Sequence, residues 1–266
     1  MKKVSVVAFL CLVATAFVAP SMAATVLGTI EIEENGLGAC GKVGFWASTN
    51  DSYNPSYQST YEIKEDDVYC GVYNFQKISG TGDADLISEL FGAVCVDVGQ
   101  YRRNGDFHIL NPEDAPDQNS YPGGPIGSEK ADILSKLWGM AFDEGWLGNY
   151  SSQSSDNKKK AEAFGFAVWE IVNERSSFFD VARGSFKINS SWDAKQLDLG
   201  NSYVNQLIED AINYTGEKTD LRIITNACGQ DFLVEVEDGE IPEPGSVFMI
   251  AAGMLGMLGI MKRRKS

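Results

Sequence analysis

Apolar and polar residues alternate along the first part of the chain, and this pattern predicts β-strands. The period of two that is typical of a half-buried strand is clearest in Thr25–Ile32. Further β-rich segments follow at 42–46, 61–75 and 93–98. His108, the only histidine, falls in the pattern of another strand. The stretch from Asn111 to Gly127 is rich in Pro, Asp, Asn and Gly, which predicts a long loop.

Beyond this loop the hydrophobic period changes to that of a helix. Three groups of apolar residues recur at helical spacing: Leu134, Leu137, Trp138, Ala141 and Phe142 after a Ser128 N-cap; Ala161, Phe164, Val168 and Ile171 after Asp156; and Val204, Leu207, Ile208 and Ala211. Strand patterns return at 221–225 and 232–237. The order predicts an α+β fold, a β-sandwich or barrel with an inserted helical subdomain at about 128–215.

The first 23 residues have the three-part pattern of a secretory signal peptide. A basic start at Lys2 and Lys3 precedes an apolar region from Val4 to Val18, and small residues lead up to Ala23. Cleavage after Ala23 would leave residues 24–240 as one exported domain.

A second apolar segment, Val247–Met261, lies near the other end of the chain. As a helix it would rise only about 22 Å, against roughly 30 Å of bilayer hydrocarbon, so it predicts a short transmembrane helix. Lys262, Arg263, Arg264 and Lys265 follow it directly. Because basic residues remain on the cytoplasmic side, this cluster predicts a cytoplasmic stop, with the domain outside the inner membrane.

The last 26 residues, 241–266, combine Pro242-Glu243-Pro244 with this apolar helix and basic cluster. The combination resembles the PEP-CTERM sorting signal of Gram-negative bacteria that make exopolysaccharide. The resemblance implies that a membrane-embedded exosortase cleaves near Pro242-Glu243-Pro244. Insertion of 247–261 would then be transient, and the processed protein would reach the cell surface or the extracellular matrix.

Composition narrows the possible partners. The net charge is −15, and it becomes more negative when Lys2, Lys3 and the basic tail are removed. Nucleic acid is therefore a disfavoured partner, because its phosphates would be repelled. An acidic soluble domain is compatible with polysaccharide or other matrix components outside the cell.

Four cysteines remain in the exported domain. An even number in an exported chain predicts one or two disulfides, with three pairings open, among Cys40, Cys70, Cys95 and Cys228. No Cys-x-x-Cys pair accompanies the one histidine, so neither a zinc site nor another cofactor is predicted. The oxygen-rich loop Asn111–Asn119 leaves calcium as an alternative to a solvated loop, although it lacks the spacing of an EF-hand.

A second resemblance concerns the strand Ala93–Val98 and the helix Phe164–Val172. These segments resemble the cysteine strand and the Gln-x-x-x-Trp helix of thioester domains, whose fold is a sandwich or barrel with a helical subdomain. In that family the cysteine and glutamine side chains condense into a thioester that captures an amine. Cys95 and Trp169 match the motif, but Gly165 stands at the glutamine position. Glycine has no side-chain carbonyl, so the thioester cannot form there.

Three functions remain open from the sequence. The first is a non-enzymatic adhesion or structural role in an exopolysaccharide or biofilm matrix. The second is a covalent thioester adhesin whose glutamine is supplied by Gln100, Gln196 or Gln206. The third is a carbohydrate-active hydrolase with a pair of carboxylates. Four tryptophans are candidates for stacking on sugar rings, although Trp138 falls on the apolar face of its helix and is predicted to be core: Trp46, Trp138, Trp146 and Trp192.

Overall fold

The structure is a computed structural model that describes residues 24–47, 63–98, 100–116, 125–175, 178–188 and 200–237. The signal peptide with Ala23, the Pro242-Glu243-Pro244 segment, the apolar run and the basic cluster lie outside the described residues. Within the described part of the chain, no helix has both the length and the apolar character needed to cross a membrane.

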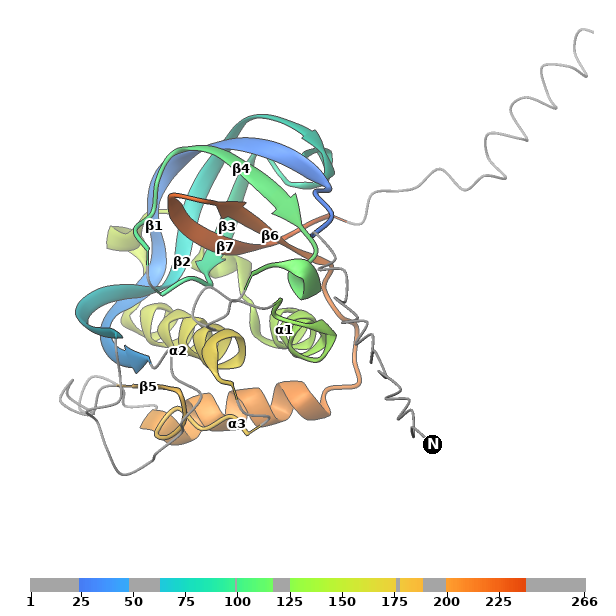
Figure 1. Ribbon diagram of the computed structural model, residues 1–266. Coiled ribbons are helices and arrows are strands. Elements are labelled where there is room, and N and C mark those ends of the chain that lie inside the picture. Colours follow the sequence, from blue (N-terminus) through green and yellow to red (C-terminus); the bar gives the residue numbers. More distant parts are fainter. Residues whose placement is uncertain are drawn as a thin grey trace, which may run out of the picture.

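Six antiparallel strands close into a barrel (Figure 1). Their order around the barrel is β1-β2-β3-β7-β6-β4, with β4 paired to β1 again. The barrel strands are β1 (Gly28–Ala47), β2 (Ile63–Gly82), β3 (Leu90–Cys95), β4 (Gly105–Leu110), β6 (Leu221–Asn226) and β7 (Gly229–Glu235). A short additional strand, β5 (Phe186–Ile188), pairs with the far end of β1. The barrel alternative of the predicted α+β fold is therefore confirmed.

Strand β1 is longer than its alternating pattern indicates. The pairing of β1 with β2 shifts register at four places between Glu31 and Phe45, and Gly36 adopts a φ of 90°. The extra residues of β1 lie between Glu34 and Cys40, whereas the other two shifts place the extra residue on β2. Each extra residue moves the side chains that follow it to the opposite face and bends its strand. The hydrophobic alternation is lost at these bulges, so the sequence predicts two short segments where the chain forms one curved strand.

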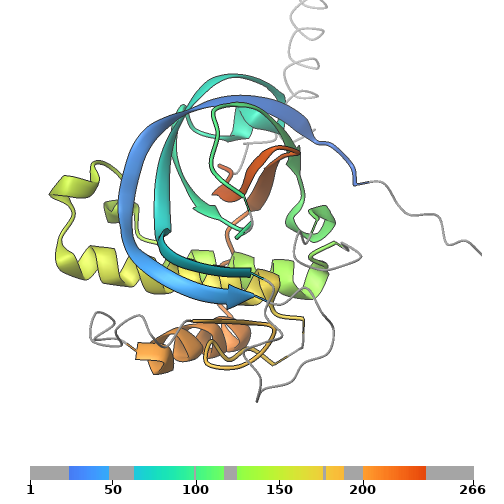
Figure 2. The same cartoon turned by 60° about the vertical axis from the view of Figure 1, so that its left-hand side comes forward.

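Three helices lie between β4 and β6 along the chain, as the predicted insertion requires. They are α1 (Ser128–Ala141), α2 (Ser155–Asn173) and α3 (Gly200–Asn213). Helix α2 crosses one end of the barrel, and α3 lies on the side of α2 that faces away from the barrel (Figure 2). Short 3₁₀ turns occur in the connections: η2 (Asp83–Leu86), η3 (Pro112–Asp114), η4 (Glu144–Trp146) and η5 (Tyr150–Ser152).

Helix α2 begins at an N-cap and then enters the core. The Ser154 side chain accepts a hydrogen bond from the backbone N–H of Asn157 at 3.0 Å, which satisfies one of the free donors of the first turn. Every residue from 163 to 173 is buried. Such all-round burial is expected of a helix held between two layers, here the barrel and the other helices.

Aromatic rings fill both sides of the interface between the barrel and the helices. Inside the barrel, Phe232 contacts Phe75 with ring centroids 4.8 Å apart and Tyr73 at 5.8 Å. On the helical side, Trp138 stacks on Phe142 at 4.2 Å, and Trp146 packs against the buried Phe164. The prediction that Trp138 is core is confirmed. Trp146 is core as well, so the expectation that it could stack on a sugar is wrong. The Trp46 side chain and Trp192 lie outside the described residues.

Candidate functional site

Gly165 brings helix α2 into direct contact with strand β2. A Cβ atom at Gly165 would lie 2.7 Å from Cys70 Sγ and 2.8 Å from the backbone nitrogen of Gly71. Both distances are shorter than van der Waals contact, so no larger side chain fits without movement of the strand. Gly165 therefore has a packing function: it permits close approach of a helix to a strand.

Trp169, one turn further along α2, contacts Cys95 on the neighbouring strand β3. Its indole Nε1 donates a hydrogen bond to the backbone oxygen of Cys95 at 2.8 Å. Cys95 Sγ donates to the backbone oxygen of Asp97 at 2.9 Å. Gly165 therefore faces Cys70, whereas Trp169 contacts Cys95. One helical turn rises about 5.4 Å, close to the spacing of about 4.8 Å between strands, so residues four apart reach adjacent strands.

The cysteines are free thiols in the structure, and the disulfide predicted from their even number is not formed. Cys40, Cys70 and Cys95 are buried, whereas Cys228 is exposed in the turn between β6 and β7. Burial raises the pKa of the Cys40 thiol to about 12, and it raises the pKa values of Cys70 and Cys95 well above their ordinary range. These three thiols are therefore protonated at neutral pH, which makes them poor nucleophiles.

Glu162, three residues before Gly165 on α2, lies against strand β1. A Cβ atom at Gly41 would fall 1.6 Å from Glu162 Oε2, so the carboxyl group occupies the space that glycine leaves open on β1. Burial raises the pKa of Glu162 to about 7, and the positive charge of Lys159 partly opposes the shift. Its backbone oxygen accepts a weak hydrogen bond from Cys70 Sγ at 3.5 Å.

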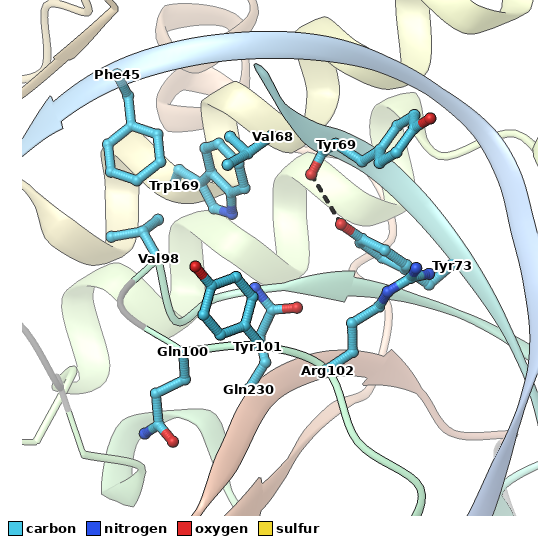
Figure 3. A pocket seen from close by; sticks show the side chains of 10 residues that line it. All are labelled: Phe45, Val68, Tyr69, Tyr73, Val98, Gln100, Tyr101, Arg102, Trp169 and Gln230. Carbon is cyan, nitrogen blue, oxygen red and sulfur yellow. Dashed lines mark hydrogen bonds between the residues drawn. The ribbon is translucent and has the colours of Figure 1, made fainter. Parts of the chain in front are cut away.

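A cavity of about 360 Å³ lies beside Trp169 at the junction of the barrel and α2 (Figure 3). Strands β1, β2 and β7, the connection from β3 to β4, and helix α2 each contribute to its wall. The residues that line it are Phe45, Val68, Tyr69, Tyr73, Val98, Gln100, Tyr101, Arg102, Trp169 and Gln230. In Figure 3, Phe45 and Trp169 lie on one side, with Tyr73 and Arg102 on the other. We refer to this cavity as the aromatic pocket.

Two polar side chains of the aromatic pocket are held in place by other parts of the chain. The Tyr73 hydroxyl donates to the backbone oxygen of Tyr69 at 2.7 Å, and burial raises the Tyr73 pKa well above its ordinary value. Gln230 Nε2 donates to the backbone oxygen of Asp97 at 3.0 Å. Tyr101 is 84% exposed at the mouth of the pocket. The pocket therefore offers aromatic faces together with amide and hydroxyl groups.

Arg102 is a charged residue of this wall. Its guanidinium carbon lies 5.3 Å from the centroid of the Tyr73 ring, and Nη1 forms a salt bridge with Glu34. Stacking on a ring and pairing with a carboxylate at the same time restrict the orientation of the planar group.

Only some of the residues singled out from the sequence line the aromatic pocket. Trp169 and Gln100 line it, whereas Gln206 lies exposed on α3 and donates to Asp210 Oδ1 at 2.8 Å. Gln196 lies outside the described residues. His108 lies exposed on β4, as the strand prediction requires. Sequence reasoning missed Tyr73, Tyr101, Arg102 and Gln230, which have no common motif and come from three separate segments of the chain.

The candidate calcium loop is described only as far as residue 116, and it contains η3. Among the described residues, no group of three or more His, Cys, Asp or Glu side chains could hold a metal ion.

The comparisons with known proteins concern the far end of the chain. Residues 240–265 match the PEP-CTERM protein-sorting motif. The chain carries an exosortase sorting signal. The match confirms the predicted signal formed by Pro242, Glu243 and Pro244 with the apolar run and basic end, and it indicates a bacterial protein that is exported and sorted to the cell surface or beyond. No curated protein and no solved structure matches the chain. The thioester resemblance stays a prediction.

Proposed function

We propose that this exosortase-sorted protein acts without catalysis in the exopolysaccharide matrix of a Gram-negative bacterium, where it holds a saccharide in the aromatic pocket. The observation that carries the proposal is the pocket itself, in which exposed Tyr101 lies beside Gln100 and Gln230. Aromatic rings pack on the apolar faces of sugars, while amides bond to their hydroxyls. The sorting signal supports this location, since it directs the protein to the environment that contains the polymer.

The arrangement around α2 favours noncovalent binding over the covalent alternative. A thioester needs a thiol and a side-chain amide held in contact. Cys70, the thiol that faces Gly165, meets a residue without a side chain. Cys95 instead donates its S–H to a backbone oxygen. Both thiols are buried with raised pKa values, so neither is prepared to attack an acyl group.

A binding measurement with two variants tests the proposal. Fragments of the producing organism's own exopolysaccharide are titrated into the processed, secreted protein. We expect Tyr101→Ala to weaken binding by about 1–2 kcal/mol, roughly tenfold, because the ring contact is lost. Phe178→Ala is the matched control, because Phe178 is also exposed but does not line the pocket. Equal affinity of both variants and wild type would refute binding at this pocket.

A hydrolase remains a second candidate because of a different cavity. This cavity, of about 290 Å³, has Glu144 and Glu235 in its wall together with Trp138. Burial, and then the charges of Glu235 and Asp143, raise the Glu144 pKa. A carboxyl group with a raised pKa near a second carboxyl group is the arrangement of a glycosidase acid and its partner. If wild type hydrolyses the exopolysaccharide and both Glu144→Gln and Glu235→Gln lose this activity, the result favours a hydrolase. If wild type does not hydrolyse the polymer, the result excludes this function.

A further inference from the structure

The charge distribution of the aromatic pocket differs from that of the whole protein. The chain has a net charge of −15, yet among the residues that the structure describes, those that line the pocket include Arg102 and no carboxylate. A binding site for a cation would need the opposite arrangement. A ligand that enters this pocket meets a guanidinium as the charged group of its wall, and this favours a ligand with negative charge.

Arg102 has donors left for a ligand after its contacts within the protein are counted. The salt bridge to Glu34 involves Nη1, and the Tyr73 ring covers one face of the group. A guanidinium carries five N–H donors in a planar fork, so it can bond to two carboxylates at different edges. About one third of the side chain is exposed, which leaves the group accessible from the pocket.

We propose that the aromatic pocket selects a saccharide unit that bears a carboxylate, such as a uronic acid, with the carboxylate on Arg102 and the sugar ring against Tyr101. This inference rests on the proposed function and adds the chemical class of the ligand. Gln100 and Gln230 then bond to the hydroxyl groups of the same unit.

The acidic surface of the protein disfavours binding of an acidic polymer outside the aromatic pocket. Charges further apart than about 8 Å are largely screened at physiological ionic strength, so the many distant carboxylates repel an acidic polymer only weakly. At shorter range they still disfavour contact of that polymer with the rest of the surface. An acidic chain is thus held at the point where a guanidinium faces it.

The test compares two probes that carry either a carboxylate or a neutral hydroxymethyl group on each sugar unit. Tetragalacturonate and its carboxyl-reduced counterpart are titrated into the processed, secreted protein by calorimetry. We expect wild type to bind the acidic probe at least about tenfold more tightly, as charge-assisted hydrogen bonds provide. Arg102→Gln removes this preference, so the affinities of the variant for the two probes become equal. Arg103→Gln removes the same charge from the adjacent residue, which is exposed and bonds to the Cys228 backbone instead, and it keeps the preference.

A second variant keeps the proposal testable if Arg102→Gln fails to fold. Glu34→Gln removes the carboxylate that competes for the guanidinium, so it should bind tetragalacturonate more tightly and the neutral probe equally well. Equal affinity of wild type for both probes would overturn the acidic preference and leave saccharide binding intact. Weaker acidic binding in Glu34→Gln would also overturn it. Binding of neither probe would overturn the choice of ligand; failure of the organism's own exopolysaccharide to bind as well would overturn the proposed function.

Discussion

At the scale of single residues, Gly165 determines how closely α2 approaches the barrel. We predict that Gly165→Ala lowers the free energy of unfolding by about 2–3 kcal/mol, because its Cβ would collide with Cys70 Sγ and the backbone of Gly71. Chemical denaturation of both proteins measures the difference.

The double variant Gly165→Ala/Cys70→Ala is the control for this prediction. It removes the sulfur but leaves the Gly71 nitrogen at 2.8 Å, so it should recover only part of the lost stability. The opposite result would be a gain of about 1 kcal/mol in Gly165→Ala, the ordinary benefit of alanine over glycine in a helix. Such a gain would show that the structure has space for a Cβ atom at position 165.

The thiols provide a second prediction at this scale. In the folded protein without reductant, we expect one thiol to react rapidly with a disulfide reagent, because Cys228 is exposed whereas Cys40, Cys70 and Cys95 are buried. The other three should react only after unfolding. Cys228→Ser should abolish the rapid phase. If unfolded, unreduced protein has fewer than four reactive thiols, the result would instead indicate the disulfide that the cysteine count predicts.

At the scale of elements, Glu162 links the stability of the contact between α2 and β1 to pH. Its pKa is about 7 in the folded protein against an ordinary value of 4.5, so the folded state favours the protonated form. The stability that this group contributes is present below pH 4.5 and is lost as pH rises through about 7.

We therefore predict that Glu162→Gln, which mimics the protonated form, is more stable than wild type at pH 8 by roughly 1–2 kcal/mol, a figure reduced for partial exposure. At pH 4 the two proteins should have nearly equal stability. Denaturation of both across this range measures the difference between them, so other titrating groups cancel. A difference that does not vary with pH would contradict the assignment.

At the scale of the whole molecule, the sorting signal directs export and sorting of the protein. We predict that Glu243→Ala, or deletion of Lys262 to Lys265, leaves a longer precursor in the membrane fraction, because recognition and the cytoplasmic stop are both needed. Immunoblots of membrane and secreted fractions measure this. Asp238→Ala, just before the matched residues 240–265, is the control and should be processed normally. Normal release of the Glu243 variant would contradict the sorting mechanism.

The sequence by itself determined the features whose signals are local. Alternation in 25–32 and the helical period in 161–171 identified β1 and α2, since burial of one face fixes the period of apolar residues. The sorting signal is likewise contiguous, and its match confirms it. An α+β order of strands, helices and strands followed directly from these segments.

Only the tertiary structure decided which of these segments meet. Barrel closure depends on the pairing of β1 with both β2 and β4, and the bulges of β1 erase the alternation that would have revealed it. Gly165 contacts Cys70 on β2 and Trp169 contacts Cys95 on β3, because the path of α2 across these two strands is set by packing. The aromatic pocket joins Tyr73, Arg102 and Gln230 from distant parts of the chain. A cavity arises from the meeting of several surfaces, and no single stretch of sequence carries its pattern.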